Sequence, residues 1–222
     1  MLEIGYNFKN KNLLEVALTH TSFSHEKKQD IEHNERLEFL GDAVLELVIS
    51  KHIFTRFSEL SEGELTKLRA SIVCEDSLAR KAREIKIGEN IKLGKGEELT
   101  GGRERDSILA DAFEAIIGAI YIDSNDILKA QDFIISKMED IIVEKRQTFE
   151  MNDCKTYLQE IIQKESTEPI KYEIVKEEGP AHDKLFTIKV THKNKQLGIG
   201  KGKSKKDAEQ AAAFKAIKLL EK

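Results

Sequence analysis

The stretch that most restricts the fold is a strongly apolar segment at residues 107–121 that carries two acids. Apolar residues occupy nearly every side of the helix that it predicts, so we expect this helix to be buried. Asp111 and Glu114 are three residues apart and face the same way. Gly118 falls on that side too and is expected to leave room beside the acids. No lysine or arginine occurs between residues 106 and 129, so the segment supplies no partner for its buried carboxylates.

A second acidic face is predicted in a helix that runs from about residue 34 to residue 57. At roughly 100° per residue, Glu35, Glu38 and Asp42 fall within an arc of about 60°. Like charges at this spacing repel one another, and a bound cation would relieve the repulsion. Taken alone, such a stripe is more often a solvated acidic face. The opposite side of the helix is expected to be core and carries Leu37, Leu40, Val44, Leu47 and Val48.

The two helices together favour a metal site over a solvated face. Two carboxylates from residues 107–121 and at least two from the first helix would suit a hard divalent cation, which prefers oxygen ligands. Phe39 lies on the acidic side of the first helix, away from its predicted core. A large aromatic there is either tucked under its own domain or inserted into a partner, and the residues alone leave both possibilities open.

Composition limits the classes of protein that the chain can belong to. It has 222 residues, of which 40% are hydrophobic and 34% charged, which is typical of a water-soluble protein of one or two domains. No apolar run approaches the ~20 residues that span a bilayer, and the N-terminus lacks the pattern of a secretory signal. Cys74 and Cys154 are far apart and are interpreted as free thiols of a reducing cytosol, so we expect a cytoplasmic protein without a membrane partner.

Charge and periodicity divide the chain in two. Residues 152–222 carry 15 lysines and 11 acids, a net charge of +4, whereas the preceding residues carry −8. A basic tail beside an acidic body suggests that the tail meets a polyanion. We therefore predict an all-α first domain at 1–147, a linker at 148–152, and a small α+β second domain at 153–222.

The expected elements follow from the apolar patterns. In the first domain they are helices at 12–18 with Asn12 as N-cap, 34–57, one that opens at 61, 75–85, 107–121 and 127–145, with loops at 19–31 and 88–105. In the second domain they are a helix at 154–165 after an N-cap at Asp153, strands at 171–175, 184–191 and 195–200, and a helix at 204–220. The order in the second domain is α-β-β-β-α.

The basic residues of the tail gather where a loop enters its last helix. Lys203, Lys205 and Lys206 lie at a helix N-terminus, where cations are disfavoured by the helix dipole. Their position there, beside free backbone N–H groups, predicts a phosphate-binding surface, although a solubilising run of charge is the alternative. Residues 198–204 are one residue short of a Walker A loop, so we expect no nucleotide cofactor.

The histidines carry little information by themselves. His182 lies on a tight loop between two strands, where a histidine is usually only solvated. The other five show no metal-binding or catalytic spacing and are interpreted as structural or surface residues: His20, His25, His33, His52 and His192.

Five motifs in one order resemble the ribonuclease III family of double-stranded-RNA endonucleases. Residues 34–42 read Asn-Glu-Arg-Leu-Glu-Phe-Leu-Gly-Asp, the family signature, and residues 108–115 read Ile-Leu-Ala-Asp-Ala-Phe-Glu-Ala, its second acidic motif. The remaining three are similar to a double-stranded-RNA-binding domain: Lys-Thr-Tyr-Leu-Gln-Glu at 155–160, Gly-Pro-Ala-His at 179–182, and Gly-Lys-Ser-Lys-Lys-Asp-Ala-Glu at 202–209.

The resemblance implies a catalytic domain that forms a homodimer and cuts both RNA strands with Mg²⁺, for which Mn²⁺ can substitute. It assigns the metal site to Glu38, Asp42, Asp111 and Glu114, with Asp42 and Glu114 catalytic and Glu114 a direct ligand. It gives supporting roles to Glu35 and Glu62, and it implies that the Phe39 side chain packs into the other subunit of the dimer.

For the tail, the resemblance assigns Gln159 and His182 to the RNA minor groove and the three lysines to phosphates. The expected product carries a 5′ phosphate, and precursor ribosomal RNA is an expected substrate. Two other functions remain open from the residues: a non-catalytic protein that binds double-stranded RNA, and a metal-dependent hydrolase of small phosphate esters.

Overall fold

The computed structural model describes residues 4–27, 31–180 and 184–220, and the side chains of 150–153 and 165 are not described. The chain divides into two compact units, residues 1–143 and 144–222. The described part of the first unit is helical, as predicted, apart from one isolated bridge between Thr19 and Lys92. Its elements are α1 (Lys11–Ala17), α2 (Thr21–Lys27), α3 (Glu35–Arg56), α4 (Glu62–Ile72), α5 (Glu75–Glu84), α6 (Ile87–Asn90), α7 (Lys95–Leu99), η1 (Gly102–Glu104), α8 (Asp106–Ser124) and the first part of α9 (Ile127–Glu165).

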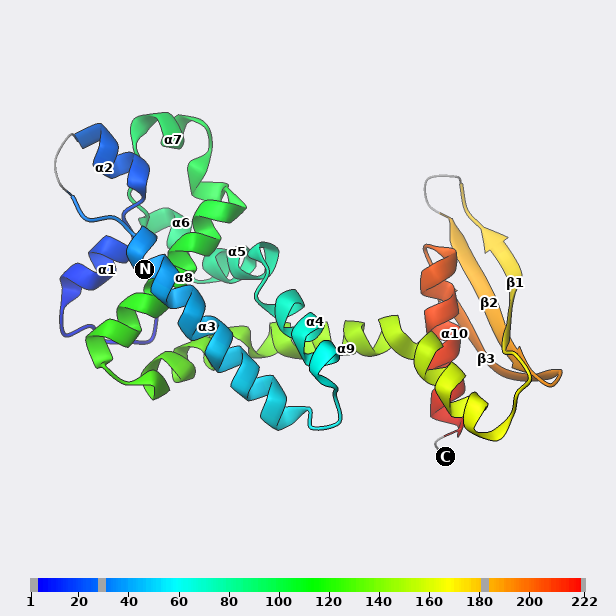
Figure 1. Cartoon of the computed structure of the whole chain (residues 1–222). Coiled ribbons are helices and arrows are strands. Elements are labelled where there is room, and N and C mark those ends of the chain that lie inside the picture. The colour runs from blue at the N-terminus through cyan, green and yellow to red at the C-terminus, as the bar shows by residue number, and fades with distance from the viewer. Residues whose placement is uncertain (1–3, 28–30, 181–183, 221–222) are drawn as a thin grey trace. The chain divides into compact units, whose positions relative to one another are not determined.

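The centre of the first unit is α8, which packs along α3 and α5 (Figure 1). This helix is buried over most of its length, as its apolar composition predicts. Its fully enclosed side chains include Leu109, Phe113, Ile116 and Ile117. The acids on α8 are therefore placed at the core of the domain by the apolar residues around them.

The buried face of α3 differs from the prediction. Leu47, expected in the core, is 60% exposed, whereas Ile49 and Ile53 are enclosed. Leu37 and Leu40 are only partly buried, and Val44 and Val48 are buried as expected. The buried arc thus extends from Val44 and Val48 round to the side of the acids, because the apolar helix that α3 packs against also carries acids on the contact side.

Two segments expected to be loops contain helices. Residues 19–31 include α2, and residues 88–105 include α6, α7 and η1. The second segment is fixed by Arg103, whose Nη1 donates to the carbonyls of Gly88 (2.8 Å) and Ile91 (2.9 Å). The glycines and charges that suggested a loop instead serve turns and ion pairs within a folded segment. The N-cap of α1 is also Asn10 and not Asn12, whose N–H it accepts (3.1 Å).

No loop separates the two predicted helices at 127–145 and 154–165. They form one helix, α9, of 39 residues, and Asp153 lies inside it. Residues 146–152 contain neither glycine nor proline, so nothing in their sequence breaks the helix. Side chains near the two ends of α9 enter different cores: Ile134 and Met138 are buried in the first unit, and Leu158 and Ile162 in the second.

The second unit has the predicted α-β-β-β-α order. Its antiparallel sheet has the order β1-β2-β3 and is followed by a helix: β1 (Lys171–Glu178), β2 (Leu185–His192), β3 (Lys195–Gly202) and α10 (Lys205–Leu220). Helix α10 packs directly on the sheet (Figure 1), because alternate residues of β3 are glycines. A Cβ on Gly200 would lie 2.2 Å from the backbone nitrogen of Ala212, so only glycine permits this contact.

The fold also bears on the cysteines and on membrane-spanning helices. Both cysteines are free, with Cys154 buried and Cys74 partly buried. Among the described helices, none combines the length and apolar character that crossing a bilayer requires.

Candidate active site

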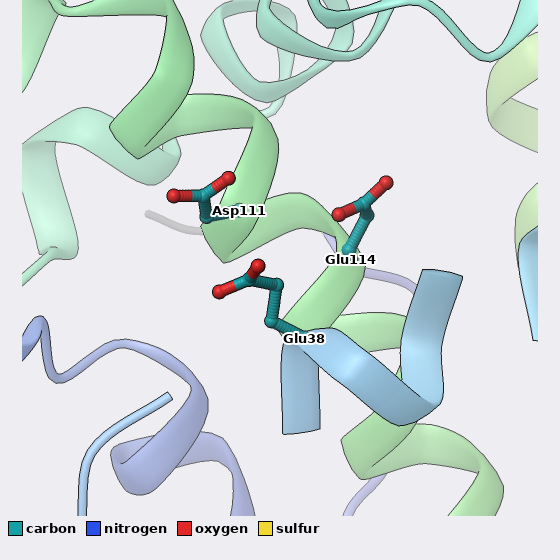
Figure 2. Close-up of side chains that lie close together, drawn as sticks. All are labelled: Glu38, Asp111 and Glu114. Atoms are coloured by element: carbon teal, nitrogen blue, oxygen red, sulfur yellow. The ribbon is translucent and has the colours of Figure 1, made fainter. Parts of the chain in front are cut away.

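Three carboxylates from two helices converge in the first unit. Glu38 comes from α3, and Asp111 and Glu114 come from α8; one oxygen of each lies within 4.8 Å of the others (Figure 2). All three side chains are half-buried. Two separate segments thus bring together three of the four predicted metal-site acids.

Two glycines set the distance between the helices. A Cβ on Gly41 would lie 1.8 Å from the carbonyl oxygen of Glu114, and one on Gly118 would lie 2.2 Å from that of Leu37. The backbones of α3 and α8 therefore touch directly at the site. The sequence suggested that Gly118 leaves room beside the acids, and this expectation was wrong. The backbone of α3 occupies the space where a side chain of residue 118 would lie. This contact brings Glu38 within reach of the acids on α8.

The electrostatics of the cluster favour a proton or a cation. Burial and, after it, the nearby charges of Asp42, Asp111 and Glu38 together raise the pKa of Glu114 to about 8. Burial also raises the pKa of Glu38, with Asp111 and Glu35 as the charges that contribute most after it. A group of acids that resists ionisation in this way can be stabilised by a divalent ion.

Asp42 lies beside this cluster but outside the group of three. Asp42 as a whole is exposed to solvent. The partial desolvation of its carboxyl group nevertheless raises its pKa, and the charge of Glu46 adds to this effect. Its charge is nevertheless the strongest of those that act on Glu114. The effect of Glu46 on Asp42 could have been predicted from the sequence, because Glu46 follows Asp42 by one helical turn on the acid stripe. The charge of Glu75 raises the pKa of Asp111, but this effect could not have been predicted from the sequence, because Glu75 comes from another helix, α5.

The two acids expected in supporting roles lie in different surroundings. The charge of Glu35 raises the pKa values of both Glu38 and Asp111, so it is next to the cluster. Glu62 lies in the first turn of α4, where it accepts a hydrogen bond from Thr66 Oγ1 (3.1 Å). Within the described chain, Glu62 is not among the charges that shift the pKa values of the three clustered acids.

The predicted RNA contacts of the second unit are exposed where the structure describes them. Gln159 is exposed on α9, and Lys203, Lys205 and Lys206 are exposed at the start of α10. Ser204 and Asp207 cap this helix reciprocally, since each backbone N–H donates to the side chain of the other. His182 lies outside the described residues.

Phe39 is 79% exposed on α3, so it is not tucked under its own domain. Leu47 and Phe54 on the same helix are 60% and 70% exposed. At helical spacing these three side chains share one face. An exposed apolar face of this kind is typical of a protein interface.

A helical domain with a buried carboxylate cluster, joined to an α-β-β-β-α module with lysines at a helix start, defines a two-domain nuclease architecture. Residues 10–141 match the family described as Ribonuclease-III-like, and residues 154–220 match the double-stranded RNA binding motif. The chain belongs to the ribonuclease III family, and it is a double-stranded-RNA endoribonuclease.

Individual relatives agree with this assignment. The chain is 50% identical over 218 residues to Ribonuclease 3 of Caldanaerobacter subterraneus subsp. tengcongensis, covering 98% of this chain and 95% of the relative. It is 50% identical over 219 residues to Ribonuclease 3 of Clostridium botulinum strain Eklund 17B, covering 99% and 94%.

Two solved structures are similar as well. The nuclease domain of ribonuclease III from Campylobacter jejuni, whose study concerns flexibility in a region involved in dimer formation, aligns with a TM-score of 0.58 at 45% identity, covering 62% of this chain and 92% of that chain. Dicer from Pichia stipitis aligns with a TM-score of 0.51 at 27% identity over 98% of each chain.

Proposed function

We propose that this endoribonuclease hydrolyses duplex RNA with a divalent ion held by Glu38, Asp111 and Glu114, with Asp42 beside it. The observation that carries the proposal is the approach of three carboxylate oxygens within 4.8 Å of one another. Oxygen ligands of this kind suit a hard cation, and we propose Mg²⁺, with Mn²⁺ as a substitute. The raised pKa of Glu114 supports the assignment, because a bound cation would compensate the charge that the site disfavours.

In the proposed reaction, the side chains of the cluster hold the divalent ion and orient the reacting groups. Glu114 and Asp42 are proposed as the catalytic acids, since the charge of Asp42 is the strongest of those that act on Glu114. When bound, the ion lowers the pKa of a coordinated water and stabilises charge on the scissile phosphate. In the hydrolysis that the site would support, a water would attack phosphorus in line with the 3′ oxygen, and the P–O3′ bond would break as that oxygen takes up a proton. The products carry a 5′ phosphate and a 3′ hydroxyl.

A symmetric homodimer is proposed through the exposed face of Phe39, Leu47 and Phe54 on α3. Burying this face against a second copy would remove the largest apolar side chains of the helix from water. Because a two-fold axis repeats every group, the dimer would present two acid clusters to one RNA duplex. We propose supporting roles for Glu35, beside each cluster, and for Glu62 in the first turn of α4.

The second unit is proposed to read the shape of A-form RNA. Gln159 and His182 are assigned to the minor groove, and the lysines at the start of α10 to phosphates. We propose domain limits of 1–147 and 153–222, with 148–152 as a helical connection. A hydrogen bond supports placing Lys155 in the second domain: its N–H, within α9, donates to Gln210 Oε1 of α10 (2.9 Å).

A Glu114→Gln variant tests the catalytic proposal. The substitution keeps the shape of the side chain but removes the charge of a direct ligand, so we expect cleavage of a long RNA duplex to be lost by roughly 100-fold or more while RNA binding is retained. Chelation with EDTA should stop cleavage by the wild-type enzyme, and added Mg²⁺ should restore it. Cleavage at the wild-type rate by the variant would contradict the assignment.

The proposed cellular setting is the cytoplasm, with precursor ribosomal RNA among the substrates.

A further inference from the structure

The first strand of the second unit, β1, has one unpaired edge. The sheet has the order β1-β2-β3, and within the described residues β1 pairs only with β2 (Figure 1). All residues of β1 except Tyr172 are exposed. The N–H and C=O groups that an edge strand directs outward can pair with another strand. The edge of β1 is therefore a surface that a further strand can reach.

A bulge in β1 decides which of its side chains share a face. The register against β2 shifts between Ile174 and Lys176, which leaves Val175 as the extra residue. Because of this shift, four charged residues lie opposite alternate residues of β2 and so share one face. They are Lys171, Glu173, Lys176 and Glu178, opposite Thr191, Lys189, Thr187 and Leu185. The other face of β2 carries the buried Ile188 and Val190, so the charged face points away from the core of the unit.

The charges on this face match one another when the strand is reversed. From Lys171 to Glu178 their order is positive, negative, positive, negative. A second β1 laid antiparallel along the free edge would place Lys171 of each copy opposite Glu178 of the other. Glu173 would then lie opposite Lys176 of the second copy. Opposite charges that face each other across two strands stabilise the pairing, and a two-fold axis repeats both contacts.

Other arrangements of the two strands bring like charges together. If the second strand slides by two residues in one direction, Lys171 lies opposite Lys176 of the other copy. In the other direction, Glu173 lies opposite Glu178 of the other copy. A parallel pairing in register puts each charge beside its own equivalent. Like charges that lie directly opposite destabilise a pair of strands, so the sequence favours the one antiparallel register.

Two exposed apolar side chains lie at the centre of this pairing. Ile174 is 44% exposed and Val175 is 55% exposed. In the favoured register, Ile174 of each copy would lie opposite Val175 of the other, with charges on both sides. Packing these side chains against one another would remove apolar surface from water.

The ion pairs within one copy leave this face able to bind another. Glu173 Oε2 lies 2.9 Å from Lys189 Nζ, and Glu178 Oε1 lies 2.7 Å from Lys176 Nζ. Exposed ion pairs contribute little free energy, and a carboxylate can accept from more than one donor. Charges and bulges can also protect a sheet edge from pairing. Protecting charges repel a second copy, whereas the charges of β1 attract it in the favoured register.

We propose that the edge of β1 binds the same edge of a second copy of this chain, antiparallel, so that the two sheets become one. The occupant is a second copy because the order of charges in β1 complements itself. This contact is additional to the proposed dimer face on α3. It goes beyond the proposed function, since none of the residues assigned to the ion or to RNA lies in β1.

A pair of engineered cysteines tests this register in the full chain. In Glu173→Cys/Lys176→Cys, each new thiol would lie opposite the other one in the second copy, at a spacing that a disulfide can bridge. We expect oxidation with diamide to give a covalent dimer at least about 10-fold faster than in either single variant, because residue 173 does not face residue 173 of the other copy. The natural Cys74 and Cys154 are present in all three proteins and are matched between them.

Exchange of the outer charges is the second test. Lys171→Glu, added to the cysteine pair, should slow formation of the covalent dimer roughly 10-fold, and Lys171→Glu/Glu178→Lys should restore it. Equal rates in the double-cysteine and single-cysteine proteins would overturn the inference, as would an equal loss in both charge variants.

Melting of the reduced proteins identifies any cysteine variant that fails to fold. Sedimentation of the charge variants without new cysteines then makes the same comparison: Lys171→Glu should weaken self-association, and Lys171→Glu/Glu178→Lys should recover it. Wild-type self-association in Lys171→Glu would overturn the inference. RNA cleavage takes no part in these measurements, so the proposed function is tested separately.

Discussion

Glu114 is the acid of the cluster whose ionisation is most hindered. Its pKa of about 8 lies far above the ~4.3 of an unperturbed glutamate, first because of burial and then because of the acids around it. A raised pKa means that folding favours the protonated form. The metal-free protein therefore keeps its full stability below the ordinary pKa of glutamate and loses stability as the pH rises towards 8.

This sign gives a pH prediction for the metal-free protein. In EDTA, thermal melting of the wild type should fall between pH 5.5 and 8.5, and Glu114→Gln should reduce that fall. At pH 8.5 the variant should be more stable by about 2 kcal/mol, after allowance for solvent screening. Mg²⁺ must displace the proton, so its affinity for the wild type should rise over the same range. A variant that melts in parallel with the wild type at every pH would show that Glu114 is ionised without cost.

A second residue-scale prediction concerns Lys206 at the start of α10. If it contacts a phosphate, Lys206→Ala should weaken binding to all RNA duplexes alike and reduce the slope of log affinity against log salt by about 1. Titrations at several salt concentrations measure this slope. Lys218→Ala, in the last turn of the same helix, is the matched control and should leave the slope unchanged. Equal slopes for both variants would remove Lys206 from the interface.

At the same scale, the sequence identified residues by type and spacing but not by what contacts them. The charges and helical spacing of Glu38, Asp111 and Glu114 were sufficient to predict that they share a site. The role of Gly118 was misread because spacing shows which face a residue occupies and not what lies on that face.

At the scale of elements, the direct contact of α3 with α8 predicts opposite outcomes for two glycine substitutions. Gly118→Ala should destabilise the protein by about 3 kcal/mol, because its Cβ would collide with the carbonyl of Leu37 and push the helices apart. Gly63→Ala in α4, where no atom lies within 4 Å of the added Cβ, should be neutral or stabilise by about 0.5–1 kcal/mol.

Chemical denaturation measures both changes, and Mg²⁺-dependent cleavage reports whether the acids remain in place. Wild-type stability in Gly118→Ala would mean that the helices can separate without cost.

The long helices were predictable because their apolar patterns are strong, whereas α2, α6 and α7 are too short to show such a pattern. The continuity of α9 was not expected because absence of periodicity was taken for a break, although residues 146–152 contain no residue that breaks a helix.

At the scale of the whole molecule, the proposed dimer can be tested at Phe39. Phe39→Ala should raise the dimer dissociation constant by roughly 10-fold or more, since truncation of an aromatic anchor commonly costs above about 1 kcal/mol. Sedimentation at low protein concentration measures this constant. Leu99→Ala is the control, because Leu99 is 87% exposed on α7 and lies outside the proposed interface. An unchanged dimer in Phe39→Ala would exclude this face as its centre.

The order of the two units was predictable at this scale because each has its own pattern: helical periodicity before residue 150, and alternating strands with clustered lysines after it. The α-β-β-β-α order was correct because each strand is bounded by residues that favour turns. The helical connection between the units was not predictable, because a helix that enters two cores has the same local sequence as one that enters a single core.

The bare main chain between Gly41 and Glu114 also separates two kinds of mutational tolerance. Elsewhere in the first unit, a substitution such as Ile116→Val can be absorbed by neighbouring side chains that change rotamer. At Gly41 and Gly118 the main chains of α3 and α8 meet directly, so rotamer changes in neighbouring side chains do not set the distance between these two helices. Core variants of this enzyme should therefore differ in stability while binding the ion with the same strength, and only changes at the two glycines should shift both together.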